Sequence, residues 1–118
     1  MGKISKNFNR QEFACQCGCG FDTVDVKLVE ILQDVRDHFM KPIKINSGCR
    51  CVKHNKAVGG SQGSKHVLAK AADFVVEGVH ENEVYSYLDD KYSDTLGLGL
   101  YKGRTHVDSR EHKARWVG

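Results

Sequence analysis

The sequence predicts an α+β fold: one small domain in which helices pack on a central antiparallel sheet. Three observations lead to this prediction: one long helical pattern, four short strand-like segments, and glycine-rich turns between them. A chain of 118 residues can bury one modest core, so we expect residues 1–118 to form a single domain.

The first twenty residues predict little regular structure. Residues 8–13 (FNRQEF) are expected to form a short helical turn, with Asn7 or Asn9 as its cap. The segment that follows, up to Gly20, combines cysteines with glycines and is expected to be a loop.

The strongest helical pattern lies between Asp25 and Met40. Asp22 or Thr23 can cap its start, and Pro42 ends it by restricting the residue before it. We expect this helix to serve the core and to have no catalytic role. Its apolar residues recur on one helical face, at Val24, Leu28, Ile31, Leu32, Val35 and Phe39.

The middle of the chain predicts two strands around a short helix. Ile43–Ser47 alternates apolar and polar residues, as in a half-buried strand, and leads into a turn. Residues 52–58 can form a short helix that stops at Gly59, and Lys70–Val76 is an almost continuous apolar strand.

The last third predicts a helix and a hairpin. Glu81–Lys91 is the helix, and Leu96–Tyr101 is a strand that alternates large side chains with glycine. A turn at residues 102–103 returns the chain to Thr105–Asp108 as the hairpin partner. Trp116 is expected to pack back on the domain.

Composition excludes several classes of protein. Hydrophobic residues make up 40% and charged residues 28% of the chain, as in soluble globular proteins. No apolar run approaches the roughly 20 residues of a membrane span, and the start lacks the apolar core of a secretory signal. The net charge of +3 suits an anionic substrate but not nucleic acid, which needs a dense basic stripe.

A loop histidine and a strand carboxylate predict a metal site. His66 follows a glycine-rich turn, Asp73 lies in the next strand, and His106 is the other histidine in a strand-like segment. Two imidazole nitrogens and one carboxylate oxygen suit zinc and leave its fourth position for water. Our hypothesis is therefore one catalytic zinc held by these three residues.

The cysteines form two clusters whose state the sequence leaves open. An odd number of cysteines and the spacing of one residue do not favour a secreted disulfide framework. Reduced thiols, at least one disulfide between the clusters, and a second, structural zinc all remain open. The residues concerned are Cys15, Cys17, Cys19, Cys49 and Cys51.

Several motifs occur in one order along the chain. They are a Ser-Gly-x-Arg turn, a His-Asn-x-x-x-Gly-Gly segment, and Ser-x-His followed seven positions later by Asp. Together they resemble the zinc D-Ala-D-Ala carboxypeptidase and L-alanyl-D-glutamate endopeptidase family. The Cys-x-Cys-Gly-Cys-Gly opening and the later Thr-His-Val-Asp and Ala-Arg-Trp segments resemble its short branch, found in phage lysis proteins. The first three motifs comprise Ser47, Gly48 and Arg50; His54, Asn55, Gly59 and Gly60; and Ser64, His66 and Asp73.

The resemblance implies a hedgehog/D-Ala-D-Ala peptidase-like fold and roles for particular residues. His66, Asp73 and His106 match the zinc ligands. Arg50 matches an arginine that faces the substrate and stabilises an oxyanion, a surface salt bridge being the alternative. Ser64 is expected to bind substrate or a neighbouring loop.

The general base is the point at which this chain departs from its relatives. Many of them carry Glu or Asp three residues before the last zinc histidine, where this chain has Gly103. Asp108 shares a strand face with His106, so it can act as the base or orient that histidine. Ala69 replaces a common glycine, with little expected consequence, and His112 is an alternative ligand.

The resemblance implies a zinc-dependent peptidoglycan peptidase that acts on cell-wall stem peptides. We expect an endolysin-like endopeptidase or a D,D-carboxypeptidase, monomeric, made in the bacterial host cytoplasm without a signal peptide and released to the wall by a separate factor. The alternatives are a non-catalytic zinc-binding module of the same fold and a phage virion-associated component.

Overall fold

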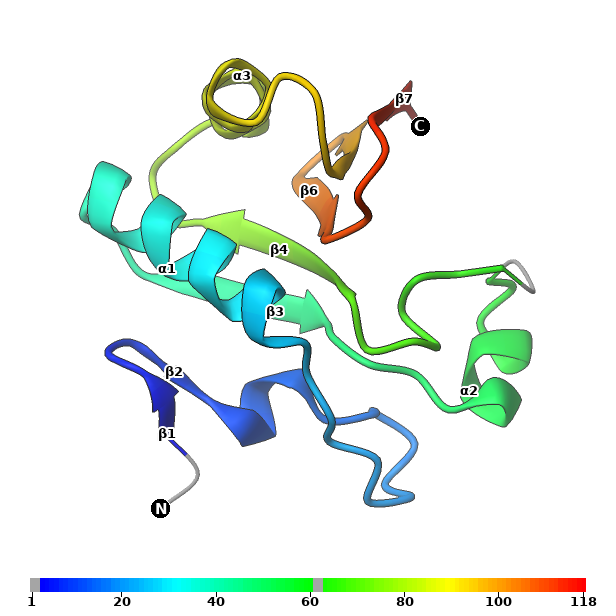
Figure 1. Ribbon diagram of the computed structural model, residues 1–118. Coiled ribbons are helices and arrows are strands. Elements are labelled where there is room, and N and C mark those ends of the chain that lie inside the picture. The colour runs from blue at the N-terminus through cyan, green and yellow to red at the C-terminus, as the bar shows by residue number, and fades with distance from the viewer. Residues whose placement is uncertain (1–2, 61–62) are drawn as a thin grey trace.

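A five-stranded sheet forms the centre of the molecule, and two helices cover one of its faces (Figure 1). The computed structural model describes residues 3–60 and 63–118. The covering helices are α1 (Val26–Phe39) and α3 (Glu81–Lys91). In order across the sheet, the strands are β3 (Ile43–Ser47), β4 (Ala71–Val76), β6 (Arg104–Asp108), β5 (Gly97–Tyr101) and β7 (Ala114–Val117).

The sheet confirms the predicted α+β class and adds a strand to it. Neighbouring strands are antiparallel except at one edge, where β7 runs parallel to β5. The segment Ala114–Val117 was expected only to pack back on the domain. It becomes a strand because it pairs with β5, which the β5–β6 hairpin holds in place. The pattern of four residues alone does not predict such a pairing.

The N-terminal segment differs from the expected loop and turn. Two short strands, β1 (Lys3–Ser5) and β2 (Phe8–Asn9), form a hairpin before the 3-10 turn η1 (Arg10–Phe13). Asn9 caps that turn, and its backbone N–H donates to Glu12 Oε2 at 2.7 Å. The predicted helical turn is thus confirmed for its last four residues only.

The ends of the helices are set by caps that the sequence left open. Asp25, instead of Asp22 or Thr23, precedes α1 as its N-cap, and its backbone N–H donates to the carbonyl of Ala69 at 2.9 Å. The short helix α2 (Val52–Ala57) follows Cys51, whose Sγ accepts from the backbone of the first turn.

The conformation of Ala69 corrects one expectation. Its φ of +59° lies in the left-handed region, where a Cβ is strained and glycine is favoured. The alanine therefore does have a structural consequence: it holds a turn between His66 and β4 in a conformation that costs about 1 kcal/mol. Hydrogen bonds on both sides, from Ala69 to His66 and from Asp25 to Ala69, keep it there.

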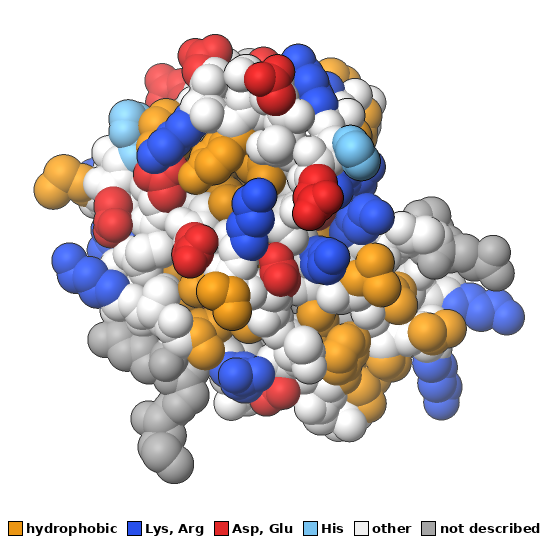
Figure 2. All heavy atoms as spheres, in the orientation of Figure 1, with side chains coloured by type: hydrophobic (Ala, Val, Ile, Leu, Met, Phe, Trp, Pro, Cys, Tyr) orange, Lys and Arg blue, Asp and Glu red, His pale blue; other side chains and the backbone are white. Residues whose placement is uncertain are grey.

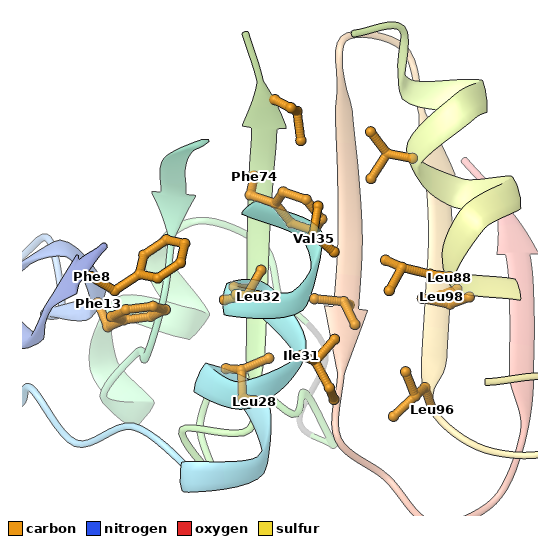
Figure 3. Close-up of a cluster of buried hydrophobic side chains, with 14 residues drawn as sticks. Phe8, Phe13, Leu28, Ile31, Leu32, Val35, Phe74, Leu88, Leu96 and Leu98 are labelled. Atoms are coloured by element: carbon orange, nitrogen blue, oxygen red, sulfur yellow. The ribbon is translucent and has the colours of Figure 1, made fainter. Parts of the chain in front are cut away.

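The core lies between the helices and one face of the sheet (Figure 3). Alternate residues of β4, Ala72, Phe74 and Val76, point into it, which leaves Ala71 and Asp73 on the opposite face. The helices contribute Leu28, Ile31, Leu32, Val35, Val84 and Leu88, all of them buried.

One core position is less than optimal. Thr105 is almost fully buried on the core side of β6, and among the described residues its Oγ1 has no hydrogen-bond partner. An unsatisfied buried hydroxyl costs about 1–3 kcal/mol, whereas valine has the same shape without that cost. Thr105→Val is therefore expected to raise the free energy of unfolding by about 1 kcal/mol, measured by urea denaturation. Thr95→Val, at a half-buried position in the turn between α3 and β5, is the control, and lower stability of Thr105→Val would contradict the prediction.

The helices of the described residues and the charges on one face of the molecule bear on two classes of partner. Within residues 3–60 and 63–118 no helix is long and apolar enough to cross a membrane. On the face seen in Figure 2, acidic and basic side chains are interspersed, with no continuous basic stripe.

Candidate metal centre

The three predicted metal ligands lie together on the sheet face opposite the helices. Asp73 of β4 and His106 of β6 are directly paired across the sheet, and His66 reaches them from the loop before β4. The Asp73 carboxylate is 2.9 Å from His106 Nδ1 and 3.4 Å from His66 Nε2. All three residues are buried, and their ligand atoms lie within 4.8 Å of one another.

Hydrogen bonds on the far side of each ring fix which nitrogen faces the centre. His66 Nδ1 is 2.6 Å from the carbonyl oxygen of Gly48, which can only accept, so this nitrogen carries the proton. His106 Nε2 is 2.8 Å from Asp108 Oδ2, a second acceptor. Both histidines can therefore direct an unprotonated nitrogen at Asp73, the arrangement that metal-binding histidines require.

The electrostatics match a site for a cation. Burial opposes ionisation of Asp73, but hydrogen bonds and charge from His106 and His66 outweigh it and hold the pKa of the carboxyl well below its usual range. Burial likewise lowers the pKa of His106, but Asp108 and Asp73 more than compensate and raise it. A higher pKa of His106 means that a metal competes more strongly with a proton for this ring.

Asp108 lies behind His106, on the side away from Asp73. It is fully buried, and its carboxylate accepts two hydrogen bonds from the Arg110 guanidinium, at 2.7 and 2.8 Å, and one from the Gly97 backbone at 3.1 Å. Burial opposes its ionisation, but His106 and Arg110 keep the pKa of Asp108 well below its usual range. Asp108 therefore contacts both the His106 ring and Arg110.

Arg50 borders the cluster from the turn after β3. Its guanidinium donates to Ser47 Oγ and Asn55 Oδ1, both at 3.2 Å, and one of its nitrogens is 3.6 Å from Asp73 Oδ2. The side chain is only 15% exposed, so most of it is buried beside the cluster. Asn55, buried in α2, is a supporting residue that we did not assign from the sequence.

The other polar candidates lie outside the ligand cluster. Ser64 Oγ accepts a hydrogen bond from the backbone N–H of His66 at 3.2 Å, which shapes the loop that carries this ligand. His112, the alternative ligand, is exposed and does not join the three ligand atoms. Gly103 lies in the exposed β5–β6 turn with a φ of +82°, a conformation that suits glycine.

The Trp116 ring packs beside His106, a contact that was not predicted from the sequence. The ring of Trp116 in β7 lies 5.0 Å from the His106 ring and also contacts the Arg110 guanidinium. The glycines of β5 leave space for two side chains. A Cβ at Gly97 would collide with the Asp108 carboxylate, and one at Gly99 would collide with the Trp116 ring. The alternation of leucine and glycine in β5 therefore serves both faces of the sheet.

Four of the five cysteines form a second cluster that could hold a metal, where the N-terminal loop meets the start of α2. The sulfur atoms of Cys15, Cys17 and Cys51 are 3.5–3.8 Å apart, and Cys19 completes the group within 4.8 Å. Cys49 lies apart from it, buried, with its thiol against the carbonyls of Phe13 and Phe21. Cys49 therefore does not belong to the cluster, although the sequence had grouped all five.

Comparison with known proteins identifies a family for this chain. A family model described as Peptidase M15 covers residues 6–108, most of the chain and all three members of the His66, Asp73 and His106 cluster. No curated protein matches the chain.

Proposed function

Because the chain belongs to the peptidase M15 family, we propose that it is a zinc-dependent peptidoglycan peptidase that hydrolyses a peptide bond in the stem peptide. The observation that carries this proposal is the buried cluster of His66, Asp73 and His106, with both rings turned by acceptors behind them. The proposed enzyme would cleave either the L-Ala–D-Glu bond, as endolysins do, or the D-Ala–D-Ala bond.

The donor set fits zinc. Two imidazole nitrogens and one carboxylate oxygen are the ligands of many hydrolytic zinc sites, which keep one position open for water. A zinc ion bound there supplies hydroxide near neutral pH and polarises the scissile carbonyl. His66, Asp73 and His106 would hold it, and Asp108 would keep the His106 ring oriented and its far nitrogen protonated.

Arg50 is the residue that we propose for stabilising the transition state. Its guanidinium donates to Ser47 and Asn55 and lies next to Asp73, so it would already be in position when a substrate carbonyl binds at the metal. A planar, permanently charged group suits an oxyanion that develops during attack.

Arg50→Gln is expected to lower kcat about 10²- to 10³-fold, the usual cost of losing one oxyanion donor, while zinc content per chain stays the same. Peptidoglycan turnover and metal analysis on the same sample measure the two quantities. Arg10→Gln removes the same charge from an exposed position in η1 and serves as the control. Unchanged kcat in Arg50→Gln would reject this role for Arg50.

The reaction itself is tested by digesting purified peptidoglycan and identifying the new termini by mass spectrometry. A new N-terminal D-Glu would support the endopeptidase and released D-Ala the carboxypeptidase. Because Gly103 offers no carboxylate where many relatives have one, a non-catalytic zinc-binding module is the second candidate. Zinc binding without any product at high enzyme concentration would favour that module and reject the peptidase.

A further inference from the structure

We propose that Cys15, Cys17, Cys19 and Cys51 bind a second zinc ion, which has a structural role and fixes the turn that carries Arg50. Thiolate sulfurs bound to zinc at about 2.3 Å in a tetrahedron are about 3.8 Å apart. The sulfur of Cys15 is 3.5 Å from Cys17 and 3.8 Å from Cys51, and Cys17 is 3.7 Å from Cys51. These three thiols thus already have nearly the spacing that zinc imposes, and the Cys19 sulfur lies within 4.8 Å of each of them.

Backbone groups stabilise negative charge on these sulfurs. The backbone N–H of Cys51 donates to Cys15 Sγ at 3.4 Å, and that of His54 donates to Cys51 Sγ at 3.3 Å. A zinc site with four cysteine ligands carries excess negative charge, and such N–H donors to sulfur offset it. Disulfides would instead require sulfur atoms about 2.05 Å apart and would bond them only in pairs.

The position of the cluster explains what the metal would do. Cys15, Cys17 and Cys19 belong to the loop before α1, whereas Cys51 directly follows Arg50 and caps α2. In Figure 1 the loop between η1 and α1 and the helix α2 lie on the same side of the molecule. Neither segment belongs to the five-stranded sheet, and hydrogen bonds such as the one from the Cys49 backbone N–H to the Phe13 carbonyl at 2.9 Å connect them. A metal ion would add a stronger cross-link between the two segments.

The link to Arg50 is short. The backbone N–H of Arg50 donates to the carbonyl of the ligand His66 at 3.0 Å, and Asn55 of α2 accepts from its guanidinium. Loss of metal at Cys51 would free both the start of α2 and the turn before it. Only this effect on turnover depends on the function proposed above; the metal site itself does not.

Metal analysis of the full chain, purified with reductant and without chelator, tests the site. Wild type is expected to contain two zinc ions per chain, and Cys17→Ser and Cys19→Ser one each. Cys49→Ser is the matched control and should retain both, because its thiol lies outside the cluster. One zinc in wild type, iron in place of zinc, or a mass showing a disulfide among the four cysteines would overturn the proposal.

Cobalt substitution separates this site from the other one. Co²⁺ bound to four thiolates gives an intense near-ultraviolet charge-transfer band, which should persist in His66→Ala and disappear in Cys17→Ser. The reverse pattern, or no thiolate band in wild type, would reject the cysteine site while leaving the proposed peptidase intact.

Stability and turnover test the structural role. Cys17→Ser is expected to lower the melting temperature by about 10 °C and kcat at least about 10-fold, with zinc retained at the histidine site. Cys17 is exposed, so its substitution removes no core packing. A Cys17→Ser variant that has lost one zinc but melts and turns over like wild type would contradict the structural role.

Discussion

Replacing His66 by alanine is expected to reduce peptidoglycan hydrolysis at least about 10³-fold and to remove one zinc per chain. His66 is buried with its Nε2 toward Asp73, so no solvent-exposed group can take its place. The metal would stabilise charge in the transition state by several kcal/mol, and loss of that stabilisation corresponds to a decrease in rate of this size. Product release from labelled peptidoglycan and zinc analysis of the same preparation measure both effects.

His112→Ala is the control for this experiment. It removes an exposed histidine outside the cluster and should leave zinc content and hydrolysis unchanged. Circular dichroism of both variants verifies that the fold is retained. A His66→Ala variant that keeps full zinc content and activity would show that the cluster is not the metal centre.

Asp108→Asn is the second substitution for which we expect a large effect. If Asp108 orients His106, the affinity for catalytic zinc should fall about 10- to 100-fold, as for other carboxylates behind metal-bound histidines. The free energy of unfolding should fall by about 2–3 kcal/mol, because the partly exposed Arg110 loses its charged partner. Excess zinc should restore most of the activity, which zinc titration and turnover at saturating zinc measure.

The same measurement separates orientation from general-base catalysis. If Asp108 accepts a proton in the reaction, Asp108→Asn remains inactive even when zinc is saturating. Activity lost with unchanged zinc affinity would therefore contradict the orienting role. Asp94→Asn removes a negative charge from an exposed position and should change neither quantity.

The parts of the fold that follow one periodic pattern were predictable. The helix α3 (Glu81–Lys91) has its expected bounds, and α1 differs from expectation mainly in its cap. The β1–β2 hairpin and β7 were missed because segments of two to four residues contain too few positions to show a period. Their pairing is decided by the partner strand, which a local pattern does not contain.

The three candidate metal ligands could also be predicted from the sequence, but the groups that support them could not. Histidine and aspartate at strand-like positions can be identified as candidate ligands by their chemistry. The carbonyl of Gly48, which turns the His66 ring, is a backbone group that every residue carries, so no residue type signals it. Likewise, spacing could not show that Cys49 lies apart from the other four cysteines.

The pairing of Asp73 with His106 has a consequence for folding kinetics. The two residues face one another across β4 and β6 but are 33 positions apart in the chain. Contacts at such separation form slowly, because loop closure precedes any gain from the contact. A metal that can bind only after these strands have paired would leave the folding rate nearly unchanged and would slow unfolding. Its main effect would therefore be a longer lifetime of the native state.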